Sequence, residues 1–244
     1  MLPFFRKIRW RLAQDNQFFK YSRYAIGEIV LVVIGILIAL QINNWNEQKK
    51  KNILEIEILT EIRQNLIMDF HDHNENLGFL NQVIFSSKII LDHLNNNIAY
   101  HDSLTTHFSW LPMAANFDPI TSGYNLWLSE GTKIIGNDSL RIQISKVYDQ
   151  RYRWLRDFLK DRQYNNNQPL LLDMMKKFKT FELLNSAQPR NYEALKSDDD
   201  FKILVQQNAY TIKITLNFYN EIVDETKKLI DDIEIEIQKL NAKI

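Results

Sequence analysis

Cysteine is absent from this sequence of 244 residues, and glycine and proline are scarce, with six and five copies. Without cysteine, the chain has no disulfide framework, no thiolate metal site and no cysteine nucleophile. So few glycines and prolines leave little material for the tight turns of a β-sandwich or a doubly wound sheet. The composition therefore favours an all-α protein with long helices.

Charge of one sign is not in excess overall, because 30 basic and 30 acidic residues balance. The two signs are nevertheless separated along the chain. Residues 1–51 contain nine Lys or Arg against Asp15, Glu28 and Glu47, so they carry +6, and the remaining residues carry −6. A nucleic-acid-binding protein would place its basic excess on the folded part. We therefore expect a basic membrane-proximal end, a mildly acidic body and no nucleic-acid partner.

One long apolar run lies near the N-terminus. Residues 29–40 are twelve consecutive apolar residues, and residues 24–42 extend the run to nineteen, interrupted only by Glu28 and Gln41. At about 1.5 Å per residue, a helix of this length measures roughly 28 Å, close to the thickness of the hydrocarbon layer. A transmembrane helix, a cleaved signal and a buried core helix all fit such a run, so its flanks must decide between them.

The flanks favour a permanent anchor. Tyr24 and Trp45 bracket the run as interfacial aromatic side chains do. The following QINNWNEQ lacks the small-x-small pair at which a signal peptidase would cut. Six Lys or Arg precede the helix and three follow it, and the positive-inside rule then predicts a cytoplasmic N-terminus. We expect a transmembrane helix at 24–45 and residues 46–244 on the other side of the membrane.

The first 23 residues form a separate basic segment. In LPFFRKIRWRLA, helical spacing gathers apolar side chains on one face and places the charged ones elsewhere. Two interpretations remain open: an amphipathic segment lying in the headgroup layer, or a short basic tail that only sets the topology. The side chains expected to anchor the chain at the membrane interface are Arg6, Lys7, Arg9, Trp10, Arg11, Tyr24 and Trp45.

Two stretches carry a family resemblance. The first is FFRKIRWRL followed by KYSRYAIGEIVLVVIGILIALQINNWNE, and the second is SGYNLWLSEGTKIIGNDSLRIQISKVYD. Together they resemble a large uncharacterised family of single-pass membrane proteins from Bacteroidota. The resemblance implies a bacterial inner membrane as the location and a periplasmic body. It implies no activity, because none is established for that family.

One face of the predicted membrane helix carries small and acidic residues. Heptad spacing places Glu28, Gly35 and Ile42 together, and Gly35 forms a small-xxx-small pair with Ala39. A carboxylate in hydrocarbon is costly, by about 2–3 kcal/mol near the centre and less near an end. Glu28 therefore has three interpretations: packing against another helix, a tolerated boundary position, or proton handling in an ion-driven complex.

The remaining chain reads as helices with few breaks. We expect an elongated, mainly antiparallel bundle of about four helices, and we discount the short alternation in DIEIEIQ as strand evidence. The expected first half is a helix at 52–96 ending at Asn95–Asn97, a short helix and loop at 98–117, and a helix opened by Asp118 and Pro119 and stopped at Gly131.

The second half starts with a cap at Gly136-Asn137-Asp138. A helix then runs from about 139, is kinked or broken at Pro169, and resumes to about Phe181. A loop follows at 185–197. The last helix is capped by Ser197 and runs to the C-terminus.

Two clusters offer candidate chemistry. In DFHDHNE, helical spacing pairs Asp69 with His73 and His71 with Glu75, but the two pairs point about 160° apart and gather no three-ligand metal site. We therefore interpret DFHDHNE as solvated helix surface and predict no metal ligands. In RYRWLRDFLKDR, we expect packing aromatic rings beside solvated arginines.

No catalytic residue and no cofactor site emerges, since the sequence has no glycine-rich phosphate loop and no G-x-S-x-G motif. The leading hypothesis is a non-enzymatic membrane protein that presents a periplasmic bundle as a scaffold or interaction module. Its expected partners are the lipid bilayer and either a second copy of itself or another membrane protein, through Glu28, Gly35 and Ala39. The alternatives are a ligand-sensing bundle that signals through a partner, and an accessory subunit of an ion-driven complex that uses Glu28.

Overall fold

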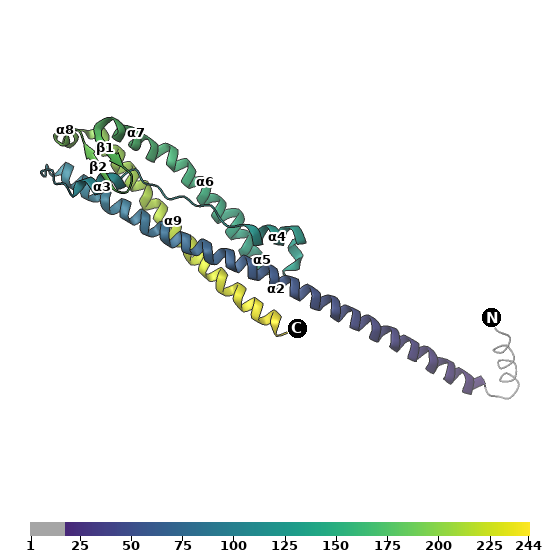
Figure 1. The fold of residues 1–244 in the computed structure, drawn as a ribbon. Helices are drawn as coiled ribbons and strands as arrows, with labels where there is room; N and C mark the ends of the chain where they lie inside the picture. Colours follow the sequence, from purple (N-terminus) through teal and green to yellow (C-terminus); the bar gives the residue numbers. More distant parts are fainter. Residues whose placement is uncertain (1–17) are drawn as a thin grey trace. The chain divides into compact units, whose positions relative to one another are not determined.

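The structure is a computed structural model that describes residues 18–244 (Figure 1). Helices dominate, and the strands among these residues form a single antiparallel hairpin, so the all-α class is confirmed. The chain divides into two compact units. The described residues up to Leu54, together with Lys243 and Ile244, belong to the first unit, and Glu55–Ala242 form the second.

The first helix, α2 (Phe18–Asn95), is 78 residues long and contributes to both units. It contains no proline, the residue that most strongly interrupts a helix. Its end matches the sequence prediction, because Asn97 adopts the left-handed conformation with φ of 53°. The Ile98 N–H then donates to the His93 carbonyl at 3.0 Å, which closes the last turn.

Three long rods build the second unit (Figure 1). The first is the part of α2 that starts at Glu55. The second runs through α5 (Asp138–Ser145), the π-helix η2 (Lys146–Tyr152), α6 (Arg153–Arg162), the π-helix η3 (Gln163–Asn167) and α7 (Gln168–Lys177). The third is α9 (Asp199–Asn241), which runs opposite to the other two, so the predicted, mainly antiparallel bundle is confirmed.

Short elements join these rods. They are α3 (Leu104–Trp110), α4 (Ser122–Glu130), the 3-10 helix η1 (Thr132–Ile134), strands β1 (Phe178–Glu182) and β2 (Ser186–Pro189), and α8 (Tyr192–Lys196). The π-helix η3 ends two residues before Pro169, which has no N–H to donate and whose ring crowds the preceding turn. The predicted irregularity at Pro169 is therefore present as a widened turn.

The hairpin corrects the sequence prediction of a helix to Phe181 and a loop from 185. Helix α7 ends at Lys177, and Phe178 is already extended, with φ of −104° and ψ of 147°. The Phe178 ring lies 5.1 Å from the Phe108 ring and 6.1 Å from the Phe201 ring, measured between centroids. Such packing against distant helices decides the strand here, because strand preference depends on tertiary contacts more than helix preference does.

Helix α4 starts three residues later than Pro119, which also corrects the prediction. The backbone before it is held extended from α2, because the Ile120 N–H donates to Asp69 Oδ1 at 3.1 Å. Asn65 on α2 then accepts from the Gly123 N–H at 2.9 Å. This N–H is one of those that a helix N-terminus leaves unpaired, so Asn65 caps α4 from another helix. A local pattern around Asp118 cannot reveal a partner more than 50 residues away.

Local caps are predicted better. The Asn137 side chain accepts from the Leu140 N–H at 3.2 Å and opens α5, as expected. Helix α9 is capped by Asp198, which accepts from the Phe201 N–H at 3.0 Å, one residue after the predicted Ser197. The alternating stretch DIEIEIQ is helical within α9, which confirms that it should be discounted as a strand.

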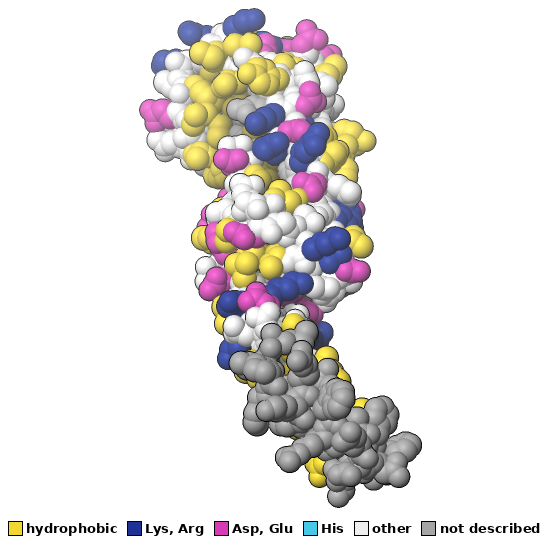
Figure 2. Space-filling model, turned by 90° about the vertical axis from the view of Figure 1, so that its right-hand side faces the viewer, with side chains coloured by type: hydrophobic (Ala, Val, Ile, Leu, Met, Phe, Trp, Pro, Cys, Tyr) yellow, Lys and Arg dark blue, Asp and Glu magenta, His cyan; other side chains and the backbone are white. Residues whose placement is uncertain are grey.

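The core of the second unit is continuous along the three rods. Fully buried side chains include Trp127, Tyr152, Tyr219, Ile62 and Leu66. A cluster around Phe108, Phe178 and Phe201 also buries Ile90, Leu94, Leu170, Met174 and Val205. On the face of the molecule in Figure 2, basic and acidic side chains are interspersed, with hydrophobic side chains between them.

Candidate functional site

The apolar run of α2 is exposed on all sides among residues 18–244. Among the described residues, α2 is a helix that is long enough and apolar enough to cross a membrane. Its most apolar 18-residue window has a mean hydropathy of 2.6 and is 0% buried. The exposed fractions of its large side chains lie between 46% at Ile34 and 71% at Leu31. No described residue buries this run, so it is not a core helix of the bundle that the described residues form.

The residues predicted for helix association lie on this exposed helix. Glu28 is exposed, and an added Cβ at Gly35 would meet no atom within 4 Å. Tyr24 and Trp45 at the two ends of the run are 74% and 61% exposed, and the Lys49 ammonium lies 5.7 Å from the Trp45 ring centroid. The other expected interface residues, Arg6, Lys7, Arg9, Trp10 and Arg11, lie outside the described residues.

A second cluster lies inside the bundle and corrects the interpretation of DFHDHNE. Asp69 and His73 are 2% and 0% exposed, so this face of α2 is core and not solvated surface. His71 and Glu75 on the other face are exposed, as predicted. A signal was present in the sequence, because Asp69 and His73 continue the three- and four-residue steps that start at Ile62 and Leu66.

Three segments pack against the Asp69–His73 pair of α2. The His73 ring lies 4.4 Å from the Phe117 ring, 5.4 Å from the Tyr152 ring of η2 and 5.6 Å from the Tyr219 ring of α9, between centroids. Tyr152 in turn lies near Thr226, with 3.4 Å between their hydroxyl oxygens. Aromatic contacts at these separations pack the pair tightly into the core.

Several polar atoms of this cluster have no hydrogen-bond partner among the described residues. They are Asp69 Oδ2, both ring nitrogens of His73, and the hydroxyl groups of Tyr148 and Tyr219. A buried polar atom without a partner costs about 1–3 kcal/mol. This part of the bundle therefore lowers the stability of the fold, whereas the apolar rows on either side of it raise it.

Burial disfavours the charged form of both side chains. Desolvation raises the pKa of Asp69 from 3.8 to about 7, against the opposing hydrogen bond from Ile120, and Asp72 adds to the rise. Desolvation lowers the pKa of His73 from 6.5 to about 4. The pKa values of Tyr148, Tyr152 and Tyr219 are raised, first of all by burial. Burial therefore disfavours both the carboxylate of Asp69 and the imidazolium of His73.

The pair is sealed from solvent, so it does not present acid–base groups to a substrate in this conformation. Within residues 18–244, no three His, Cys, Asp or Glu side chains come together as a metal site.

The stretch RYRWLRDFLKDR is partly as predicted, because Trp154 stacks on Phe158 at 4.8 Å between ring centroids. Arg162, however, is only 5% exposed and donates to Thr215 Oγ1 at 3.2 Å, and burial lowers its pKa to about 10.

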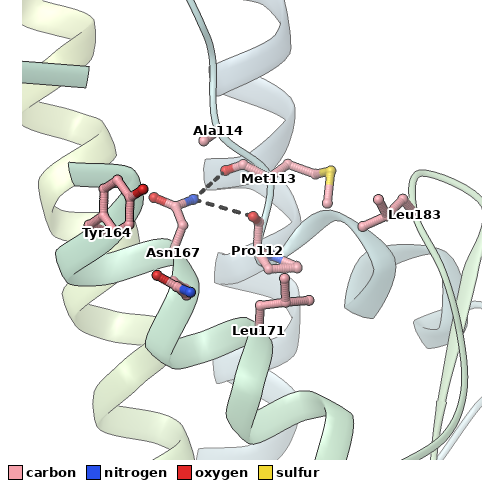
Figure 3. A pocket seen from close by; sticks show the side chains of 8 residues that line it. Pro112, Met113, Ala114, Tyr164, Asn167, Leu171 and Leu183 are labelled. Carbon is pink, nitrogen blue, oxygen red and sulfur yellow. Dashed lines mark hydrogen bonds between the residues drawn. The ribbon is translucent and has the colours of Figure 1, made fainter. Parts of the chain in front are cut away.

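Sequence reasoning missed a cavity of about 460 Å³ in the second unit (Figure 3). It is lined by Pro112, Met113 and Ala114 from the segment after α3, Tyr164 and Asn167 from η3, Gln168 and Leu171 from α7, and Leu183 from the hairpin turn. In Figure 3 the Met113 side chain extends towards Leu183, and Asn167 lies between Tyr164 and the Pro112–Met113 backbone. No local sequence pattern brings these segments together.

The walls of this cavity are fixed by three asparagines. Asn167 Nδ2 donates to the carbonyls of Pro112 and Met113 at 3.3 Å and 2.9 Å. Asn208 Nδ2 on α9 donates to the Leu111 carbonyl at 2.8 Å. Asn166 Nδ2 donates to Thr211 Oγ1 at 3.0 Å, which ties η3 to α9. The cavity is therefore preformed, as small-molecule sites usually are.

Comparison with protein families assigns the chain. It belongs to a family of unknown function, DUF6090, whose model matches residues 28–221. The match starts inside the apolar run of α2 and ends within α9, so it includes both clusters and the cavity. Neither the curated proteins nor the solved structures contain a match to the chain.

Proposed function

We propose that this protein is a membrane-anchored, non-catalytic scaffold whose helical bundle contacts other proteins. The observation that carries the proposal is the apolar run of α2, which is exposed on every side. A helix that is apolar all round is stable in lipid or inside a large protein core, and the described residues provide no such core around this run.

Insertion into a bilayer is favourable by simple accounting. Residues 29–42 contain eleven Ile, Leu or Val side chains, and each contributes about 0.3–0.6 kcal/mol of insertion free energy, or roughly 3–7 kcal/mol together. Glu28 opposes insertion by less than about 3 kcal/mol, because it lies near one end of the run. The balance favours a helix that stays in the membrane.

The distribution of basic residues supports one orientation. Six Lys or Arg precede the run and three follow it, so we infer a cytoplasmic N-terminus and a periplasmic bundle in a bacterial inner membrane. In this arrangement Tyr24 lies at the cytoplasmic interface and Trp45 at the periplasmic one. The basic segment that includes Arg6, Lys7, Arg9, Trp10 and Arg11 would meet the anionic inner leaflet.

We further infer that the anchor self-associates through Glu28, Gly35 and Ala39. Small residues allow two helices to approach closely in lipid, and a neighbouring helix can supply a hydrogen bond to the Glu28 carboxyl. A scaffold role also fits the interior of the bundle, because its Asp69–His73 pair is sealed from substrates. Contacts are then left to the outer surface of the bundle and to the anchor.

Disulfide crosslinking tests the association, and the cysteine-free chain makes it clean. Asn46 lies 18 residues, or about five helical turns, after Glu28 and therefore on the same face. Asn44 lies on nearly the opposite face. In native membranes under mild oxidation, N46C in the full chain should form a crosslinked dimer, and N44C should form much less.

Equal crosslinking at the two positions would contradict a defined interface. Only monomer at both positions, with no crosslinked partner protein, would contradict the interaction proposal. Adding Gly35→Leu to N46C sharpens the test, because a bulky side chain prevents close approach without making the helix less apolar. Dimer formation should then fall at least about fivefold, which corresponds to about 1 kcal/mol.

A further inference from the structure

The preformed cavity of the second unit carries an inference that does not depend on membrane anchoring. We propose that the cavity in Figure 3 binds an uncharged, mainly apolar small molecule that donates one hydrogen bond to the Asn167 side chain. Its volume of about 460 Å³ lies within the range of small-molecule sites.

The cavity lining contains no charged side chain, which favours an uncharged ligand. None of its eight lining residues is Asp, Glu, Lys, Arg or His. A charged ligand would have to leave water without an opposite charge to receive it, which is strongly unfavourable. Pro112, Met113, Leu171 and Leu183 offer apolar side chains, with the polar groups of Tyr164, Asn167 and Gln168 beside them. A ligand with an apolar body and a polar, uncharged group fits this lining.

Asn167 supplies the polar contact. It is 6% exposed, and its Nδ2 donates to two backbone carbonyls. Because carbonyls only accept, the amide cannot be turned over without losing both bonds. Asn167 Oδ1 is thus left as an acceptor beside the cavity, and an N–H or O–H of the ligand can donate to it.

The rim of the cavity is exposed in a way that a purely structural void does not need. The side chains of Leu183 and Tyr164 are 58% and 72% exposed. Leu184, which follows Leu183 in the hairpin turn, has φ of 62°, a left-handed conformation that is rare for a bulky side chain. Apolar rims and strained turns of this kind are typical of binding sites.

The test uses diphenylamine, an uncharged two-ring molecule with one N–H donor. The full chain in lipid nanodiscs carries a trifluoromethyl thiol tag at Asn185→Cys in the exposed hairpin turn, and the ¹⁹F shift reports binding. We expect a saturable shift with a Kd between about 1 mM and 10 µM, typical of a ligand of this size. Partition of the probe into lipid changes the free concentration equally for all variants.

Two ligand controls examine the proposed chemistry. N-methyldiphenylamine has the same rings without the donor, so it should bind about three- to tenfold more weakly, as expected for one lost hydrogen bond. Diphenylamine-4-sulfonate carries a negative charge and should give no saturable shift. Equal binding of all three molecules would overturn the assignment of Asn167 and of an uncharged ligand.

Matched variants examine the place of binding. Leu171→Trp fills the cavity, whereas Leu172→Trp puts the same side chain on the outside of α7, where Leu172 is 50% exposed. Binding should be lost in the first variant and unchanged in the second. Ala114→Phe, at an exposed position of the lining, blocks the cavity without disturbing the core and should also abolish binding. Unchanged binding in folded Ala114→Phe, or no saturable shift in the parent, would overturn the proposal.

Discussion

In helix α2, residues 29–42 and residues 58–94 are both rich in apolar side chains, but only the second stretch buries most of them at least partly. In the first, every large apolar side chain is at least 46% exposed. In the second, Ile58, Leu59, Ile62 and Leu66 are fully buried, and polar side chains cover the outer face. The backbone is helical in both, so the side-chain pattern decides that one stretch stays exposed and the other is buried in the bundle.

The two stretches also differ in how they treat a carboxyl group. Glu28 lies on the exposed apolar stretch and is itself exposed. Asp69 lies inside the bundle, where it receives the Ile120 N–H and where desolvation raises its pKa to about 7. An acid among apolar residues is thus a candidate for contact with a second molecule in one stretch and part of an internal cluster in the other.

The largest expected effect is the difference between two Ile→Lys substitutions at positions of nearly equal exposure. Ile34 in the apolar run is 46% exposed and Ile235 on α9 is 49% exposed. Ile34→Lys should cost about 3 kcal/mol of membrane insertion, and Ile235→Lys should change stability by less than about 0.5 kcal/mol. Membrane fractionation of cells that express each variant measures the difference. Similar fractionation of both variants would erase the distinction between the stretches.

A second prediction compares two glycines of α2 and its neighbour α4. A Cβ at Gly123 would lie 2.6 Å from the Ile62 backbone nitrogen, whereas a Cβ at Gly78 would meet nothing within 4 Å. Gly123→Ala should therefore destabilise the bundle by about 2 kcal/mol through overpacking. Gly78→Ala should stabilise it by about 0.5–1 kcal/mol, since alanine is the better helix former. Urea unfolding of the detergent-solubilised protein, followed by tryptophan fluorescence, gives both values.

The third prediction concerns pH and the Asp69–His73 pair. Because the pKa of Asp69 rises from 3.8 in the unfolded chain to about 7 on folding, its contribution to stability is lost as pH rises through that window. The pKa of His73 falls from 6.5 to about 4, so its contribution is lost as pH falls through that window. The two slopes oppose each other where the windows overlap.

Single substitutions should expose each slope. Asp69→Asn keeps an acceptor for the Ile120 N–H and should raise stability by about 1–2 kcal/mol at about pH 8, because no buried carboxylate has to ionise. The same variant should lose more stability than the parent on acidification to about pH 4, since His73 is then uncompensated. Urea unfolding at a series of pH values checks both signs. A profile parallel to that of the parent would contradict the burial of this pair.

The smallest effect is a helix cap. Asp198 accepts from the Phe201 N–H and also pairs with Lys177, with 2.7 Å between Oδ2 and Nζ. Asp198→Ala should destabilise the bundle by about 1 kcal/mol. Asp200→Ala removes the same charge from the first turn of α9 without removing the cap, so its cost should be a few tenths of a kcal/mol. Thermal unfolding monitored by circular dichroism distinguishes the two variants.

Sequence reasoning recovered what depends on neighbours in the chain. Apolar patterns predicted helices at 24–45 and 52–96, which the structure joins into the single helix α2, and they also predicted α9. Local caps predicted the end of α2 at Asn95–Asn97 and the start of α5 after Asn137. Sequence reasoning also identified the apolar run as part of a helix that is long enough to cross a membrane. These features follow from helical geometry and short-range hydrogen bonds, which a sequence displays directly.

It failed where distant residues decide the structure. Asn65 caps α4 and Asp69 holds Ile120 from another helix, so no local pattern at Asp118 could show where α4 begins. The hairpin depends on Phe178 packing between Phe108 and Phe201. Asp69 and His73 were assigned to the surface by residue type, although their spacing continued the buried row.

The central claim is that residues 24–45 stay in the membrane and the bundle lies outside the cytoplasm. Two single-cysteine variants of the full chain test it, Ser129→Cys on the exposed side of α4 and Gln14→Cys in the N-terminal segment. In spheroplasts, a membrane-impermeant maleimide should label the first and leave the second unlabelled until lysis, and both proteins should stay in the membrane pellet after alkaline carbonate extraction. Labelling of Gln14→Cys from outside, or recovery of the intact chain in the soluble fraction, would contradict the account.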